Sequence, residues 1–166
     1  MDGINSADVH RVVFICTGNM CRSPMAERIL RKKWAERPRP ELIVSSMGTY
    51  APENKSAPEP VIAICDENGI DIRDHLTRPL NAPELDAADL IFTMEKVQRD
   101  FIALFLPKLK DKIFLLGAWP MVESRKSIVP DPIGRNLKEY RKTFQLIEQH
   151  MDRILPSLEE VVAKAG

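Results

Sequence analysis

The amino-acid sequence predicts an α/β fold in which a mainly parallel sheet is covered by helices on both faces. Short apolar segments suited to strands alternate with longer segments whose apolar residues repeat at helical spacing. Such alternation is typical of parallel strands joined by crossover helices. In such folds functional residues lie beyond the carboxyl ends of the strands, and the segment CTGNMCRSP directly follows the first predicted strand.

Four segments rich in β-branched or aromatic residues are predicted to be strands. They are 11–16 (RVVFIC), 42–46 (LIVSS), 90–94 (LIFTM) and 113–116 (IFLL). The first strand is followed within a few residues by a helical pattern, so the chain begins with a strand, a tight loop and a helix.

Helical spacing of apolar residues predicts four helices. Ser23 is expected to cap the first helix, and Pro24 to be its first residue. Gly69 is expected to end the second helix, and Pro156 to kink or interrupt the last one. The predicted helices cover about 24–34, 60–68, 96–105 and the region from 136 onward.

Length and composition indicate one ordinary globular domain of 166 residues, with 44% hydrophobic and 29% charged residues. Acidic and basic residues balance at 24 each, so no overall field favours nucleic acid or an anionic membrane. The first ten residues are polar and lack the pattern of a signal peptide. We expect a flexible extension over 1–10, a single domain over 11–166, a cytoplasmic location, and a monomer or weak dimer.

The chain has three cysteines, Cys16, Cys21 and Cys65, and this odd count without a secretory signal argues against a disulfide framework. A zinc site is not expected, because no C-x2-C pair or nearby histidine completes four ligands. Cys65 falls on the apolar face of a predicted helix and is expected to fill the core. No metal and no cofactor is expected.

The loop from Cys16 to Arg22 has the composition of a phosphate-binding loop. Backbone N–H groups between a strand and a helix can converge on an anion, and the helix N-terminus adds positive potential. The Arg22 guanidinium is suited to holding two phosphate oxygens at once. The same field favours the thiolate form of Cys16, which makes this residue a candidate nucleophile.

Attack by a thiolate on a phosphate ester also needs a proton donor for the departing oxygen. Asp131 is the candidate, because it follows the fourth predicted strand and is flanked by Pro130 and Pro132, which stiffen its loop. The same carboxylate is then available to accept a proton from the water that attacks the phosphoenzyme.

The segment VVFICTGNMCRSPMAE and the later VPDPIG resemble the signature and acid loop of the low-molecular-weight protein tyrosine phosphatase family. The resemblance covers roughly 11–155 and includes SMGT after the second strand. It implies a three-layer α/β/α sandwich with a central four-stranded parallel sheet. It also implies a hydrolase that dephosphorylates proteins through a cysteinyl-phosphate, releasing phosphate.

The resemblance also assigns roles to individual residues. It implies that Ser23 donates a hydrogen bond to the Cys16 thiolate, that Asn19 holds the loop in shape, and that Ser46 supports Asn19. Cys21 matches a cysteine able to form a reversible disulfide with Cys16. The loop residues expected to contact substrate are Thr17, Gly18, Asn19, Met20, Cys21 and Ser23, with Tyr50 as a stacking wall.

The sequence departs from the family pattern at several positions. Ile133 and Gly134 replace the aromatic residues that often follow Asp-Pro, and Met20 replaces a frequent isoleucine. Many members have a histidine near Asn68, whereas His75 is expected here only to pack a turn. These differences leave phosphotyrosine as the favoured substrate and phosphoarginine as the alternative.

Two other functions are less well supported. Arsenate reduction on this fold needs further cysteines to pass oxidation along, and only Cys65 remains. A phosphate-binding module without catalysis is disfavoured because nucleophile, clamp and acid are all present.

Overall fold

The computed structural model describes residues 10–38 and 41–164 and contains one four-stranded parallel sheet. Its strands are β1 (His10–Cys16), β2 (Leu42–Gly48), β3 (Leu90–Thr93) and β4 (Ile113–Leu115), in the order β2-β1-β3-β4. The predicted parallel α/β fold is confirmed. His10 belongs to β1 and is buried, so the strand begins inside the predicted extension; residues 1–9 lie outside the described residues.

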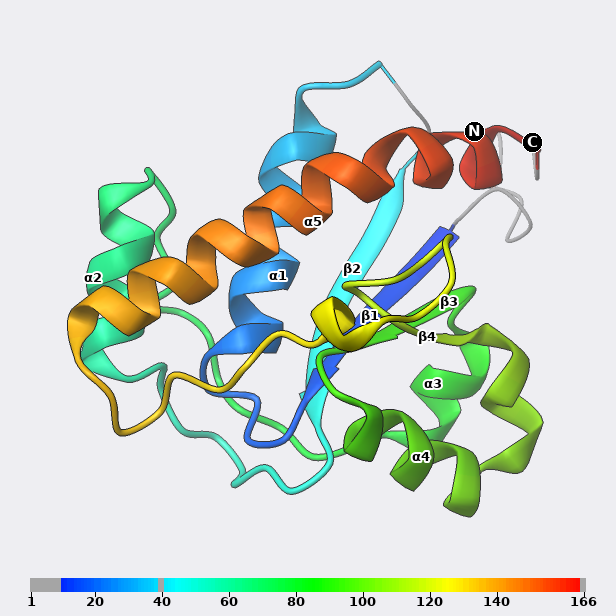
Figure 1. Ribbon diagram of the computed structural model, residues 1–166, viewed down its shortest axis with the longest axis horizontal. Helices are drawn as coiled ribbons and strands as arrows, with labels where there is room; N and C mark the ends of the chain where they lie inside the picture. The colour runs from blue at the N-terminus through cyan, green and yellow to red at the C-terminus, as the bar shows by residue number, and fades with distance from the viewer. Residues whose placement is uncertain (1–9, 39–40, 165–166) are drawn as a thin grey trace, which may run out of the picture.

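Helices cover both faces of the sheet, which confirms the three-layer arrangement (Figure 1). One face packs against α1 (Arg22–Ala35), α2 (Glu59–Glu67) and α5 (Leu137–Lys164), and the other against α3 (Ala82–Ala87) and α4 (Lys96–Phe105). Two short 3₁₀ segments, Pro107–Lys112 and Arg125–Ser127, flank β4.

Alternation along β1 explains why two cores form. Val12 and Phe14 join the larger cluster beneath α1 and α5, whereas Val13 and Ile15 join the smaller cluster beneath α3 and α4. Side chains of a strand point alternately to opposite faces, and this central strand is buried on both.

The start of α1 differs from the prediction. The helix begins at Arg22 with Cys21 as N-cap, and Ser23 makes no capping hydrogen bond. The Ser23 hydroxyl instead contacts Cys16 and Asn19 inside the loop. A side chain committed to the loop cannot also cap the helix.

Two further helical predictions need correction. α5 continues through Pro156 without interruption. Pro156 is exposed, so the carbonyl that loses its N–H partner there can be solvated. α3 was not predicted because its six residues are too few for a helical period, although Asn81 caps it by accepting a hydrogen bond from the Glu84 N–H. Gly69 has a positive φ of 71°, in agreement with its predicted place at the end of α2.

The order of strands in the sheet reverses at β1, which creates a topological switch point. β1 connects to β2 on one side, while β3 returns to pair with β1 on the other. Ligands of open parallel sheets bind at such a switch point, beyond the carboxyl ends of the strands. Cys16 ends β1 at this point, at the lower end of the sheet in Figure 1.

Among residues 10–38 and 41–164, no helix combines the length and apolar character needed to cross a bilayer.

Candidate active site

Residues 17–21 form a tight loop between β1 and α1. Within the described residues, no acceptor is found for the backbone N–H groups of Gly18, Asn19, Met20 and Cys21. The side chains of Asn19 and Cys21 are buried. Unpaired N–H groups in a loop that leads into a helix N-terminus form an anion-binding nest. The loop therefore has the geometry of a phosphate cradle.

The Cys16 thiol lies at the base of this loop. Its Sγ is 3.0 Å from the Ser23 Oγ, and Asn19 Nδ2 donates to the same Oγ over 3.0 Å. Ser23 Oγ also lies 3.4 Å from the Met47 carbonyl oxygen, so this carbonyl and Cys16 are alternative acceptors for its single hydrogen. The contact joins the same two side chains, Cys16 and Ser23, that the family resemblance pairs.

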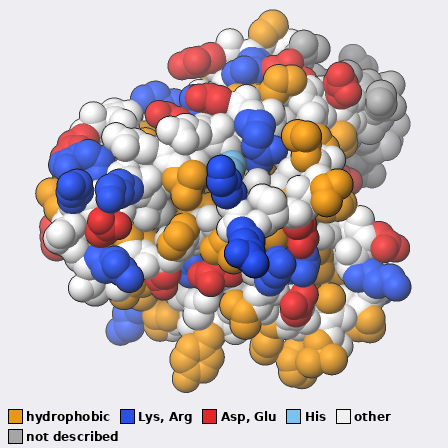
Figure 2. Space-filling view, in the orientation of Figure 1, with side chains coloured by type: hydrophobic (Ala, Val, Ile, Leu, Met, Phe, Trp, Pro, Cys, Tyr) orange, Lys and Arg blue, Asp and Glu red, His pale blue; other side chains and the backbone are white. Residues whose placement is uncertain are grey.

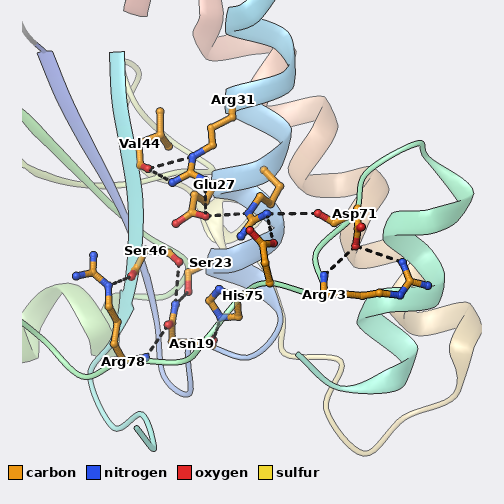
Figure 3. Close-up of polar contacts among 12 residues, drawn as sticks. Asn19, Ser23, Glu27, Arg31, Val44, Ser46, Asp71, Arg73, His75 and Arg78 are labelled. Carbon is orange, nitrogen blue, oxygen red and sulfur yellow. Dashed lines mark hydrogen bonds and ion pairs between the residues drawn. The ribbon is translucent and has the colours of Figure 1, made fainter. Parts of the chain in front are cut away.

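Asn19 holds the loop at its most unusual backbone position, a positive φ of 53°. Its amide nitrogen donates to Ser46 Oγ at 3.0 Å, and its side-chain oxygen accepts from the Arg78 backbone N–H at 3.0 Å. The Arg78 N–H can only donate, so the orientation of the Asn19 amide is defined. Figure 3 shows Asn19 between the end of β2 and the segment carrying His75 and Arg78.

Gly48 allows the end of β2 to approach the loop closely. A Cβ atom at this position would lie 2.5 Å from the Thr17 carbonyl oxygen and 2.9 Å from the Asn19 backbone nitrogen. Such contacts would displace the phosphate loop, so only glycine fits here. This requirement explains the glycine of SMGT in physical terms.

Arg22 is buried, and its guanidinium is held from two directions. Nη1 pairs with the Glu95 carboxylate and donates to the Val129 carbonyl at 2.9 Å. Nη2 lies 3.5 Å from Asp131 Oδ2. The structure thus brings Asp131, from the loop after β4, to the loop that carries both Cys16 and Arg22.

The N-terminus of α4 supports this arrangement, and neither residue that does so was singled out from the sequence. Glu95 and Gln98 form a capping box, in which Gln98 Oε1 accepts from the Glu95 N–H at 2.8 Å. The Gln98 amide then donates to Thr17 Oγ1 at 3.1 Å. The spacing Glu-x-x-Gln signals a helix start, but it carries no information about the contact with Arg22.

Asp131 lies on the loop after β4, with 42% of its side chain exposed. Its Oδ1 accepts a hydrogen bond from the Ile133 N–H at 3.0 Å, so the carboxylate also organises its own turn. Gly134 follows with a positive φ of 81°. A half-exposed carboxylate at the edge of the cradle is accessible to both substrate and water.

The other two cysteines are buried and free. Burial raises the pKa of the Cys21 thiol well above its usual value, and Cys16 and Asp131 nearby raise it further. Cys65 lies in the core beside α1 and α5, as predicted, and burial raises its pKa to about 12. The disulfide between Cys16 and Cys21 stays a prediction.

Met20 and Tyr50 lie at the rim. Met20 is half-buried, with its side chain over Gly18. Tyr50 is 88% exposed, and its backbone N–H donates to the Thr17 carbonyl at 2.9 Å. Tyr50 and Thr17 also line the same groove.

His75 has a larger role than the sequence indicated. Its Nε2 lies 2.8 Å from the Asn19 carbonyl oxygen, and because a carbonyl only accepts, the ring donates this hydrogen bond. Asn68 instead bonds to the Ile64 carbonyl in its own helix. The hydrogen bond between His75 and Asn19 was not predicted because 56 positions separate the two residues in the sequence.

Burial lowers the pKa of His75 below its usual 6.5, although the hydrogen bond to Asn19 and the charge of Glu27 oppose this shift. A lowered folded-state pKa means that the unfolded chain binds the proton more readily. Stability from this group is complete above about pH 6.5 and decreases as the pH falls below that value. We expect His75→Gln, which keeps a donor, to reduce the loss of Tm on acidification.

His150 is the matched control, because burial lowers its pKa in the same direction but it lies on α5. His150→Gln should also flatten the dependence of Tm on pH. Because His150 lies on α5 and not in the phosphate loop, this variant should leave phosphate binding unchanged. Equal slopes for the wild type and His75→Gln would contradict the account of His75.

Known proteins are similar to this chain in both sequence and fold. The family described as low molecular weight phosphotyrosine protein phosphatase matches residues 11–164. The low molecular weight protein-tyrosine-phosphatase Ptp of Acinetobacter johnsonii is 34% identical over 82% of this chain and 89% of its own length.

Solved structures of related phosphatases have the same fold as this chain. The YwlE arginine phosphatase from Geobacillus stearothermophilus superimposes with a TM-score of 0.83 at 30% identity, over 93% of this chain and 96% of its own. A YwlE mutant with a phosphorylated active-site serine also gives a TM-score of 0.83, at 27% identity over 89% and 95% of the two chains.

A thiol at the base of a phosphate cradle, on a parallel α/β sheet, defines a class of cysteine-dependent phosphatases. The chain belongs to the low molecular weight phosphotyrosine protein phosphatase family and is a hydrolase.

Proposed function

We propose that this protein removes phosphate from phosphotyrosine in proteins, with Cys16 as nucleophile, Arg22 as phosphate clamp and Asp131 as acid and then base. The observation that carries the proposal is the cradle itself: four unpaired backbone N–H groups over a thiol that lies 3.0 Å from Ser23 Oγ. Thr17, Gly18, Asn19, Met20, Cys21 and Ser23 would surround the bound phosphate, with Ser46 supporting Asn19.

The reaction would proceed in two displacements. The Cys16 thiolate forms a bond to phosphorus while the bond to the phenolic oxygen breaks, and Asp131 protonates that oxygen. Water then attacks the cysteinyl-phosphate, Asp131 takes its proton, and the thiolate is released with inorganic phosphate. Arg22 and the backbone N–H groups stabilise the charge on the transferring group in both steps. This chemistry requires no metal and no cofactor.

An apolar rim favours an aromatic substrate. Met20 carries a thioether and no hydroxyl, and Tyr50 offers an exposed ring beside the loop. Both suit the ring of phosphotyrosine. Ile133 is also partly exposed on the acid loop, although it supplies no aromatic wall.

Phosphoarginine is the second candidate. Gly134 adopts a positive φ of 81° with open space around it, so the acid loop lacks the bulk that would confine a ring. The similarity to an arginine phosphatase of known structure supports the same alternative.

The deciding experiment compares kcat/KM for peptides of one sequence that carry phosphotyrosine, phosphoarginine or phosphoserine. The proposal expects phosphotyrosine to be preferred, and Met20→Thr to shift the ratio toward phosphoarginine. A tenfold or greater preference of the wild type for phosphoarginine (a ratio that corresponds to about 1.4 kcal/mol) would reject the phosphotyrosine assignment. An unchanged ratio in Met20→Thr would reject the argument from Met20.

Asp131→Asn tests the acid. Poor leaving groups depend on protonation more than activated ones, so this variant should slow phenyl phosphate by roughly 10²-fold or more and nitrophenyl phosphate much less. Plotting log(kcat/KM), which excludes the water step common to all substrates, against the leaving-group pKa provides the measurement, in which the variant gives the steeper slope. Parallel lines for the two enzymes would show that Asp131 is not the proton donor.

We also propose that residues 11–166 act as one phosphatase domain in the cytoplasm, as a monomer or weak dimer without nucleic-acid or membrane partners. A peroxide would oxidise the Cys16 thiolate to the sulfenic acid, and the Cys21 thiol would then displace water to form the disulfide. The raised pKa of Cys21 predicts faster closure at higher pH.

A further inference from the structure

The surface beside the active site carries an unusual concentration of exposed hydrophobic side chains. Val97, Phe101, Leu104 and Phe105, all on α4, are between 40% and 75% exposed. Figure 2 shows hydrophobic side chains along the lower edge of the molecule, over α4 and the loop that follows β2. A helix of a soluble protein normally buries its apolar face and exposes a polar one.

α4 has two apolar faces, and only one belongs to the core. Ile102 is buried in the cluster beneath the sheet, which accounts for the inner face. Val97, Phe101 and Phe105 are spaced by four residues and form a continuous outer stripe. The rings of Phe101 and Phe105 lie in contact, with centroids 4.8 Å apart. The fold therefore does not use this second stripe.

The stripe continues into the active site. A groove of about 210 Å³ is lined by Thr17 and Thr49 together with Tyr50, Val97, Gln98 and Phe101. Thr17 belongs to the phosphate loop and accepts the hydrogen bond of Gln98. A chain segment whose phosphorylated side chain enters the cradle would pass directly into this groove.

We propose that the outer stripe of α4, together with Tyr50, is a docking surface for apolar side chains that flank the phosphorylated residue of the protein substrate. The proposal rests on the proposed function and adds to it a preference for sequence context. Continuity with the phosphate loop favours the substrate over a second copy of this chain, because the groove lining joins Thr17 of that loop to Val97 and Phe101 of the stripe. Buried apolar area would supply binding that a small aryl phosphate cannot obtain.

The test uses phosphotyrosine and phosphoarginine peptides in a Gly/Ser background, with a single leucine moved through each flanking position. For each enzyme, kcat/KM is divided by that for nitrophenyl phosphate, which corrects for changes in the chemistry. In the wild type, leucine at one or two positions should raise this ratio by about tenfold. Phe101→Ser should abolish the gain, and Val97→Ser should reduce it.

Val161→Ser is the matched control, because Val161 is an exposed valine on α5; it should retain the full leucine preference. Phosphopeptide turnover without any leucine preference would reject the docking surface but leave the proposed function standing. Turnover of nitrophenyl phosphate without turnover of any phosphopeptide would reject both. A wild-type dimer in sedimentation that Phe101→Ser dissociates, with the leucine preference retained, would identify the stripe as a self-interface and overturn the proposal.

Discussion

Replacing Cys16 by serine should lower kcat for an aryl phosphate by roughly 10⁴-fold or more, while phosphate binding remains measurable by calorimetry. A hydroxyl is a far weaker nucleophile at neutral pH, but the cradle of backbone N–H groups and Arg22 does not depend on the sulfur. Removal of the nucleophile and preservation of the binding site are thus separable effects.

Mass spectrometry supplies the second measurement on Cys16→Ser. Prolonged incubation with substrate should place any covalent phosphate at position 16, by analogy with the phosphorylated active-site serine of the related arginine phosphatase mutant. Phosphate trapped on another residue, or substantial turnover by this variant, would reject Cys16 as the nucleophile.

Replacing Arg22 by lysine should lower kcat by on the order of 10²–10³-fold, close to the loss caused by alanine. The Arg22 guanidinium bonds to Glu95 and the Val129 carbonyl through one nitrogen, and its other end reaches toward Asp131. A lysine ammonium is a single point and cannot hold the Glu95 carboxylate and two phosphate oxygens in fixed directions at once.

Comparison with Glu95→Gln separates charge from orientation. The glutamine retains an oxygen that can accept from Arg22, so kcat should fall much less than in Arg22→Lys. Circular dichroism and thermal unfolding check that both variants fold. A lysine variant with the wild-type rate would reject a bidentate role for Arg22.

The elements with clear local signals were predictable from the sequence. α4 has the predicted bounds because its helical period is complete within Lys96–Phe105, and β1 and β3 are apolar on both faces. The same local reasoning failed at Ser23, whose hydroxyl could serve either a helix end or the loop. Only the fold places Asn19 and Cys16 within its reach.

The supporting residues of the site were not predictable in the same way. Glu95 and Arg22 are 73 positions apart, and His75 and Asn19 are 56 apart. No periodicity or motif spans such separations, because these pairs form only when crossovers bring distant loops to one edge of the sheet. The residues that would contact phosphate follow one another in the sequence, whereas the residues that hold them come from β2, α4 and the segment after α2.

The dense contacts of Asn19 have a consequence for when conformational entropy is lost. Ser46, Ser23, His75 and the Arg78 N–H restrict this residue before any ligand arrives. The ordering of the loop therefore takes place during folding, and phosphate meets donors that are already in position. Residues that never touch the substrate thus set part of its affinity, and loosening Asn19 would weaken binding even though every phosphate ligand remained in the chain.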